Sequence, residues 1–242
     1  MASATFSQDM DPLGHWEDPR TALHYARAAV QVGLWKSERM LAERHLGKDA
    51  RILELGCGAG RIALGLAQLG WHRITPTDIA GAMVELANGV LVERGSPLRA
   101  IQADARDLPF PDGAFDAALF GFNGLMCIRG RAERARALRE IHRVLRPGGL
   151  LLLTAHDREC GESREHWRDA VAPADGELGD RWHGSDSSPV FIHAGTKAET
   201  SAELTEAGFA VIETAMRSEL ADEPPEVRAF SDDTRWFVTR RA

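Results

Sequence analysis

Three glycines at alternate positions, Gly56, Gly58 and Gly60, follow a short apolar run at 51–55, and a helical pattern begins at once after them. Glycine adopts backbone torsions that other residues avoid, and it lets a ligand lie directly against the main chain. The free N–H groups at the start of the following helix favour an anionic or carboxylate-bearing group. The spacing therefore predicts a small polar ligand at the carboxyl end of a strand.

Two acidic residues follow where the next strands are expected to end. Asp78 lies about 20 residues beyond the glycines, where a carboxylate can accept hydrogen bonds from ribose hydroxyls. The alternative for Asp78 is a helix N-cap, which is compatible with that role. Asp104 can accept from an exocyclic amine such as that of adenine, and its alternative is a solvated loop acid.

The residue after the third glycine separates two classes of ligand. The dinucleotide pattern G-x-G-x-x-G requires a glycine where this chain has Arg61, and Glu54 stands two residues before the first glycine. A nicotinamide-dependent oxidoreductase is therefore disfavoured by Arg61 and by the second acid, Asp104.

The elements that position these residues alternate between strand and helix. Apolar runs predict strands at 51–55, 73–78, 98–103, 115–120, 150–155, 209–213 and 234–239. Helical patterns occupy 18–35, 37–46, 60–69, 80–94, 131–145 and 196–207. This alternation predicts a parallel sheet with right-handed crossovers, and the last two strands, joined without a helical pattern, are expected to pair antiparallel.

The pattern weakens between residues 156 and 195, where Gly, Pro, Asp and Ser recur beside Trp167 and Trp182. Structureless segments of this length inside a compact domain are usually functional, so we expect a lid or substrate-binding insertion here.

Composition excludes several classes of protein. The chain has 242 residues, 44% of them hydrophobic, which suits one α/β domain, and its net charge of −7 without a basic run argues against nucleic acid or membrane partners. We find no signal peptide or membrane span. Three separated cysteines indicate a reducing, cytoplasmic compartment. We expect no metal, because the spacing of His156, Asp157, Cys160 and His166 fits no metal motif.

Several segments in order resemble the motifs of class I S-adenosylmethionine (SAM)-dependent methyltransferases, in the small-molecule, type 11/25-like branch. They are residues 52–60, 77–78, 102–105, 108–116 and 140–149. The resemblance implies a Rossmann-like α/β sheet of seven strands in the order 3-2-1-4-5-7-6, with strand 7 antiparallel and helices on both faces. It divides the single domain into an N-terminal helical lid (1–47), a SAM-binding core (48–155), a substrate-side insertion (156–195) and a C-terminal helix with antiparallel strands (196–242).

The same resemblance assigns roles to residues. Glu54 and the glycine turn would hold the methionine part of SAM, Asp78 the ribose, and Asp104 with Ala105 the adenine edge. Met83 would pack on the adenine or ribose, with a plain core residue as the alternative. The implied cofactor-binding set is Glu54, Gly56, Cys57, Gly58, Gly60, Asp78, Ile79, Met83, Asp104, Ala105 and Phe120.

Methyl transfer from a sulfonium requires mainly that a nucleophile lie in line with the S–CH3 bond, and some nucleophiles also require a base. The candidates are His156 after the fifth strand, His183 and His193 in or after the insertion, and Tyr25 in the N-terminal helix. Hydrogen-bonded loop or surface histidines and a packing tyrosine are the alternatives. The tip at 120–123 lacks the Asp/Asn-Pro-Pro-Tyr pattern of enzymes that methylate base amines.

The functional hypothesis is a methyltransferase, monomeric or homodimeric, that acts on a small-molecule O-, N- or C-nucleophile and releases S-adenosylhomocysteine (SAH). Four tryptophans favour an apolar or aromatic acceptor, with ordinary lid and core packing as the alternative: Trp16, Trp35, Trp167 and Trp182. The alternative is a catalytically silent protein that binds SAM or SAH in a regulatory or assembly role.

Overall fold

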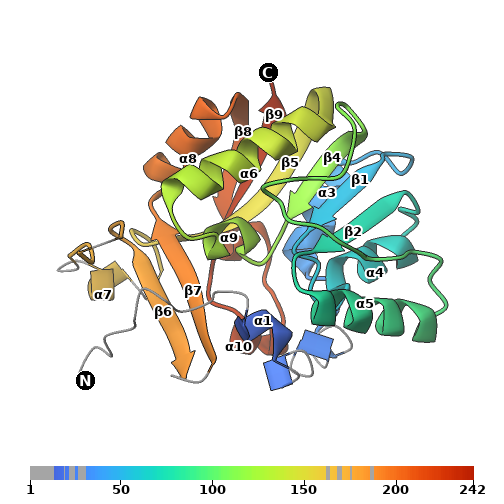
Figure 1. Ribbon diagram of the computed structural model, residues 1–242, viewed down its shortest axis with the longest axis horizontal. Coiled ribbons are helices and arrows are strands. Elements are labelled where there is room, and N and C mark those ends of the chain that lie inside the picture. Colours follow the sequence, from blue (N-terminus) through green and yellow to red (C-terminus); the bar gives the residue numbers. More distant parts are fainter. Residues whose placement is uncertain are drawn as a thin grey trace.

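A computed structural model describes residues 14–18, 20–21, 25–26, 31–161, 164–167, 171–174, 176–185 and 188–242. Its centre is a sheet with helices on both faces (Figure 1). The parallel strands are β1 (Ile52–Leu55), β2 (Ile74–Asp78), β3 (Ile101–Gln102), β4 (Phe115–Phe120) and β5 (Leu145–Asp157), in the order β3-β2-β1-β4-β5.

The far edge of this sheet is antiparallel. The last strand, β9 (Arg235–Arg241), lies between β5 and β8 (Phe209–Met216) and runs opposite to both. The predicted antiparallel pairing of the last two strands is thus confirmed. Leaving aside one hairpin, the pairing runs β3-β2-β1-β4-β5-β9-β8, which corresponds to the expected seven-stranded plan.

Helices follow the strands at the expected places. The main ones are α3 (Lys36–His45), α4 (Arg61–Gln68), α5 (Gly81–Glu93), α6 (Arg131–Val144) and α8 (Lys197–Glu206). Shorter ones are α1 (Gly14–Glu17), α7 (Arg164–Trp167), α9 (Arg217–Leu220), α10 (Pro225–Phe230) and the 3-10 turn η1 (Gly124–Cys127). The helix expected at 18–35 lies partly outside the described residues.

Alternation along the buried strands divides the core between the two faces. In β4, Ala118 and Phe120 pack with α6 and α8, whereas Ala117 and Leu119 pack with α3, α4 and α5. Successive side chains of a strand point to opposite faces, so a sheet covered on both sides needs strands that are apolar throughout. Such a sheet fixes the carboxyl ends of β1, β2 and β4 at one edge.

The structure corrects three expectations about the chain after residue 155. In the described part of the chain the sheet has nine strands rather than seven, because β6 (Asp180–Ser185) and β7 (Ser188–Gly195) form a hairpin within the segment expected to be irregular. Glycine, serine and Pro189 interrupt its apolar alternation, which hid both strands. Two helices, α9 and α10, join β8 to β9, and each is too short to show a helical period.

The hairpin joins the sheet only at its base. β7 pairs in parallel with the end of β5, at His156 and Asp157, and α1 packs against β7 and α5. The hairpin, α1 and α10 therefore lie near the sheet edge where the strands end (Figure 1).

Across the described part of the chain, no helix combines the length and the apolar character needed to cross a bilayer.

Candidate active site

The glycine turn after β1 has the backbone that the sequence predicts. Gly56 and Gly58 have φ values of 60° and 52°, and a Cβ on Gly56 would meet the Phe120 ring at 3.3 Å. Non-glycine residues are uncommon at such φ values. The turn therefore exposes main chain to whatever lies over it.

Gly60 has a different role from the other two glycines. It is the N-cap of α4 with φ 78°, and a Cβ there would meet Ala87 of α5 at 3.5 Å. Gly60 is absent from the described residues that line the cavity below, and its Cβ position is in ordinary van der Waals contact with α5.

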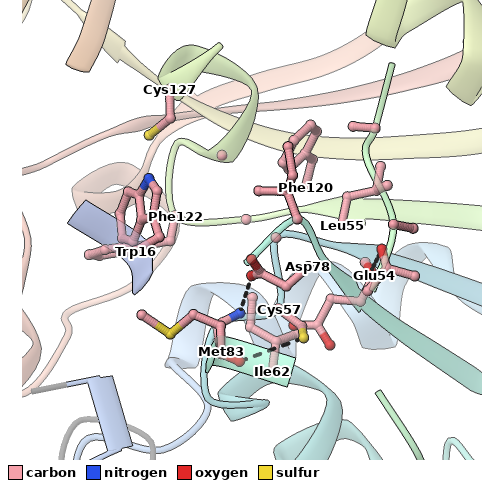
Figure 2. Close-up of a pocket in the computed structure, with 18 of the residues that line it drawn as sticks. Trp16, Glu54, Leu55, Cys57, Ile62, Asp78, Met83, Phe120, Phe122 and Cys127 are labelled. Atoms are coloured by element: carbon pink, nitrogen blue, oxygen red, sulfur yellow. Dashed lines mark hydrogen bonds between the residues drawn. The ribbon is translucent and has the colours of Figure 1, made fainter. Parts of the chain in front are cut away.

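A cavity of about 380 Å³ opens over this turn. Figure 2 shows Asp78 near its centre, with Glu54 on one side and Trp16, Phe122 and Cys127 on the other. The predicted cofactor-binding residues in its lining are Glu54, Gly56, Cys57, Gly58, Asp78, Ile79, Met83, Asp104, Ala105 and Phe120. We call these ten residues the donor end of the cavity, after the methyl donor that they are predicted to bind.

Glu54 is the most unusual group at the donor end. It is 2% exposed, and its Oε2 atom has no hydrogen-bond partner among the residues that the structure describes. Burial raises the pKa of Glu54 to about 8, against the opposing effect of the Arg61 guanidinium. A buried carboxylate oxygen without a partner is costly, and a ligand that brings a cationic donor would relieve that cost.

Asp78 holds the glycine turn against β2. Its Oδ2 accepts from the Gly58 N–H at 2.8 Å, and its Oδ1 accepts from the Ala80 N–H at 3.0 Å. The N-cap residue of α5 is Ala80, so Asp78 is not the helix cap that was its alternative role. Burial raises the pKa of Asp78, and the backbone hydrogen bonds oppose that shift.

Asp104 is paired rather than simply solvated. Arg106 donates to both of its oxygens, with an Nη2–Oδ2 distance of 2.7 Å, and also reaches Glu133 at 3.1 Å. Burial opposes the effect, but the hydrogen bonds from Arg106 hold the pKa of Asp104 below its ordinary value. Asp104 is therefore an ionised acceptor on the cavity wall.

Of the candidate catalytic residues whose side chains the structure describes, Tyr25 is the one that lines the cavity. Burial raises the pKa of its phenol well above the ordinary value. His156 and His193 are absent from the described lining. His156 Nε2 lies 3.1 Å from Asn123 Nδ2, and the buried His193 is 2.7 Å from Asp180. His183 lies in β6, where its backbone pairs with Val190.

The opposite end of the cavity combines the predicted candidate Tyr25 and Trp16 with two rings, Phe122 and Phe230, that were not predicted as site residues. Its aromatic rings come from α1, from the segment before α3, from the loop after β4 and from α10. They are Trp16, Tyr25, Phe122 and Phe230, which we call the aromatic end. Arg61, Cys127 and Arg129 also line the cavity.

The rings of the aromatic end contact one another. Phe122 stacks on Phe230 at 5.3 Å between centroids, and Tyr25 contacts both rings edge-on. Phe122 and Asn123 have φ values of 49° and 61°, which is rare outside glycine. The position of Phe122 two residues after the buried strand β4 could have indicated its role, whereas Phe230 has no signal in the sequence.

One group of described side chains has the spacing of metal ligands, namely Glu177, Asp180 and His193. Glu177 accepts from Arg134 at 2.9 Å, and Asp180 is paired with His193. Each member already has a protein partner, so we assign no metal here. Asp157, one of the residues whose spacing was compared with metal motifs in the sequence, is paired with Arg235 at 2.7 Å.

The donor end fits SAM by its own chemistry. The methionine part of SAM has an ammonium group, and Glu54 Oε2 is a buried acceptor without a described partner. The exposed glycine main chain and the Asp78 carboxylate supply the close approach and the acceptor that a nucleoside needs.

The chain is similar to known methyltransferases. Residues 53–153 match a family model described as a methyltransferase domain. The chain is 36% identical over 132 residues to the demethylmenaquinone methyltransferase of Thermus thermophilus, covering 54% of this chain and 53% of that protein. It is 31% identical over 206 residues to an O-methyltransferase of Pyrenophora dematioidea, covering 83% and 68%.

Among solved structures, a SAM-dependent methyltransferase from Methanosarcina mazei superposes with a TM-score of 0.69. At 22% identity, with 86% of this chain and 98% of that chain covered, this likeness shows the fold. The chain spans about half the length of the first curated relatives that it matches. The motif residues, the fold and the relatives agree, and the chain belongs to the class I SAM-dependent methyltransferases.

Proposed function

We propose that this chain transfers the methyl group of SAM to a small-molecule acceptor by in-line displacement and releases SAH. The observation that carries the proposal is the donor end, where a buried carboxylate oxygen without a described partner faces the same cavity as the glycine turn. A sulfonium already has a good leaving group, so the main work of the site is to align the acceptor and to exclude water.

In this proposal Glu54 binds the methionine ammonium, and the main chain at Gly56 and Gly58 lies against the methionine part. Asp78 accepts from the ribose, and Asp104 with Ala105 binds the adenine edge. The Asp104 carboxylate can do this beside Arg106 because two carboxylate oxygens offer about four lone-pair sites. Met83, Ile79 and Phe120 supply the apolar walls.

The acceptor would lie at the aromatic end. Phe122, Phe230 and Tyr25 offer large apolar faces that suit an aromatic or otherwise apolar molecule. Because the pKa of Tyr25 is raised, its phenol stays protonated near neutral pH and acts as a hydrogen-bond donor rather than a base. The relatives include enzymes named as C- and O-methyltransferases, and the experiment below is open to both kinds of acceptor.

Calorimetry and a transfer assay test the proposal. SAH should bind to the wild-type chain, and Asp78→Ala should weaken that binding by about hundredfold, since it removes a ribose acceptor and releases the glycine turn. Methyl transfer from labelled SAM to a panel of phenols, enols and quinols should reveal an acceptor. Binding of NAD in place of SAH would refute the proposal. Tight SAH binding without any acceptor would favour the catalytically silent alternative.

A further inference from the structure

Arg61 is the first residue of α4, directly after the glycine turn, and it lines the cavity together with Glu54. Its side chain is only 10% exposed. Nη1 and Nη2 donate to the two carboxylate oxygens of Glu38 at 2.6 and 2.5 Å, and Nη1 also donates to the Gly33 carbonyl. This forked pairing holds the guanidinium in one place.

Glu38 is fixed as firmly from the other side. Its side chain is 3% exposed, and its Oε2 also accepts from the Trp35 N–H at 2.8 Å in the first turn of α3. The Trp35 ring lies 4.4 Å from the Arg61 guanidinium carbon. Neither charge can move away from the donor end without breaking several buried contacts.

Three charged side chains act electrostatically on Glu54, and two of them, Arg61 and Asp78, line the same cavity as Glu54. The three are Arg61 from α4, Glu38 from α3 and Asp78 from β2. Arg61 favours the ionised form of Glu54, and the two acids disfavour it. Glu54 itself has no exposed surface of consequence, so solvent screens these effects weakly.

We propose that the buried Arg61–Glu38 pair is a positioning pair that sets the charge of Glu54, and with it the pH range over which the donor binds. The inference rests on the proposed role of Glu54 toward the ammonium of SAM and SAH. When the ligand binds, the protonated carboxyl of Glu54 releases its proton to solvent, and the resulting carboxylate pairs with the ammonium.

The test measures SAH binding by calorimetry from about pH 6 to about pH 9 in two buffers of different ionisation enthalpy. The wild-type chain should release close to one proton per SAH at the acidic end of this range. Its affinity should rise by about tenfold per pH unit until Glu54 is ionised in the free protein.

Two substitutions should then act in opposite directions. Arg61→Gln removes the charge that favours ionised Glu54, so the midpoint of the pH profile should move up. Glu38→Gln removes an opposing charge and leaves Arg61 in excess, so the midpoint should move down. A purely structural pair predicts something else, because both variants break the same contact and should weaken binding alike with no shift of the midpoint.

Matched variants guard against loss of folding. Arg61→Lys keeps the positive charge but loses the forked hydrogen bonds to Glu38, so its midpoint should stay closer to the wild-type value than that of Arg61→Gln. Arg217→Gln removes the other guanidinium on the Trp35 ring, 5.0 Å away and outside the described lining, so it should leave the midpoint unchanged. If a single variant unfolds, the double Glu38→Gln/Arg61→Gln variant leaves no unpaired charge. Its midpoint should still rise, because Arg61 lines the same cavity as Glu54 whereas Glu38 is absent from the described lining.

The outcomes separate this inference from the proposed function. If SAH fails to bind the wild-type chain, the proposed function falls. If SAH binds but the midpoint stays fixed, or moves the same way, in folded Arg61→Gln and Glu38→Gln, the role of the pair is refuted while the proposed function stands.

Discussion

The donor end of the cavity is formed by short stretches at the ends of neighbouring strands, whereas the aromatic end takes one ring each from four separate segments. At the donor end, the Gly58 N–H and the Asp78 carboxylate are joined by a hydrogen bond between adjacent strand ends. At the aromatic end, Phe122 and Phe230 meet only because α10 folds back over the loop after β4.

The two ends of the cavity thus suit two different tasks: one binds a methyl donor that is always the same, and the other selects the acceptor. Main chain at a strand end keeps its geometry whatever the side chains are, which suits a donor that does not change. Side chains carried by short helices and loops can change one at a time without disturbing the sheet. Four predictions test whether the two ends are independent in this way.

The largest expected effect concerns the charge buried at the donor end. Because the pKa of Glu54 is raised from 4.5 to about 8, the folded chain holds a proton that the unfolded chain gives up over that interval. This contribution to stability is therefore present at low pH and is lost as pH rises from about 4.5 to about 8, on the order of 5 kcal/mol. Urea unfolding of the ligand-free chain near both pH values measures it.

Glu54→Gln should lack this loss, so the comparison is the difference between the two pH curves. Glu43→Gln is the matched control, because Glu43 is 46% exposed beside Arg39 and should leave the curve unchanged. If the free energy of unfolding changed with pH in the same way in the wild-type chain and in Glu54→Gln, the raised pKa of Glu54 would be refuted.

A second substitution fills the space that main chain leaves open. Gly56→Val places a branched side chain at φ 60° and a Cβ 3.3 Å from the Phe120 ring. The strain and the lost close approach should weaken SAH binding by about two to three orders of magnitude. Gly47→Ala is the control, because its backbone is ordinary and nothing lies within 4 Å of its Cβ position. Normal SAH affinity in Gly56→Val would overturn the main-chain account of this end.

The third prediction moves to the aromatic end. Phe122→Ala removes the ring that stacks on Phe230 and contacts Tyr25, so kcat/KM for the acceptor found by the transfer assay should fall by about hundredfold. SAH affinity should stay within about threefold of wild type if the ends are independent. Phe122→Tyr, which keeps the ring, should retain most activity. A large loss of SAH affinity in Phe122→Ala would show that the ends are coupled.

The same contrast explains what the sequence could predict. The strands and long helices of the core are recognisable from the local order of apolar and polar residues. The residues of the donor end lie mainly where these elements begin or end. Ten of the eleven predicted cofactor residues therefore share one cavity. Gly60 shows the limit, because a glycine signals a close approach without saying whether a ligand or a helix approaches.

The aromatic end depends on long-range packing that no local pattern records. Phe230 lies in a helix of six residues, and its contact with Phe122 joins segments far apart in the chain. The histidines show a second limit of the sequence, because a residue type that can act as a base also makes good structural hydrogen bonds. His156 and His193 both make such bonds in the structure.

The smallest expected effect tests that last distinction. With its proton on Nδ1, His156 accepts at Nε2 from the Asn123 amide, and the Asn123 N–H donates to Thr154 Oγ1 at 2.8 Å, so both hold the turn that presents Phe122. His156→Ala should lower kcat/KM by about tenfold, the cost of one lost hydrogen bond, without altering SAH affinity. His156→Gln should restore much of the activity, because its side-chain carbonyl can accept from the same amide. A general base predicts instead a loss of about 10² to 10⁴ that glutamine does not rescue. That result would show that His156 acts on the acceptor directly, and that the acceptor site extends along β5 beyond the residues that line the cavity.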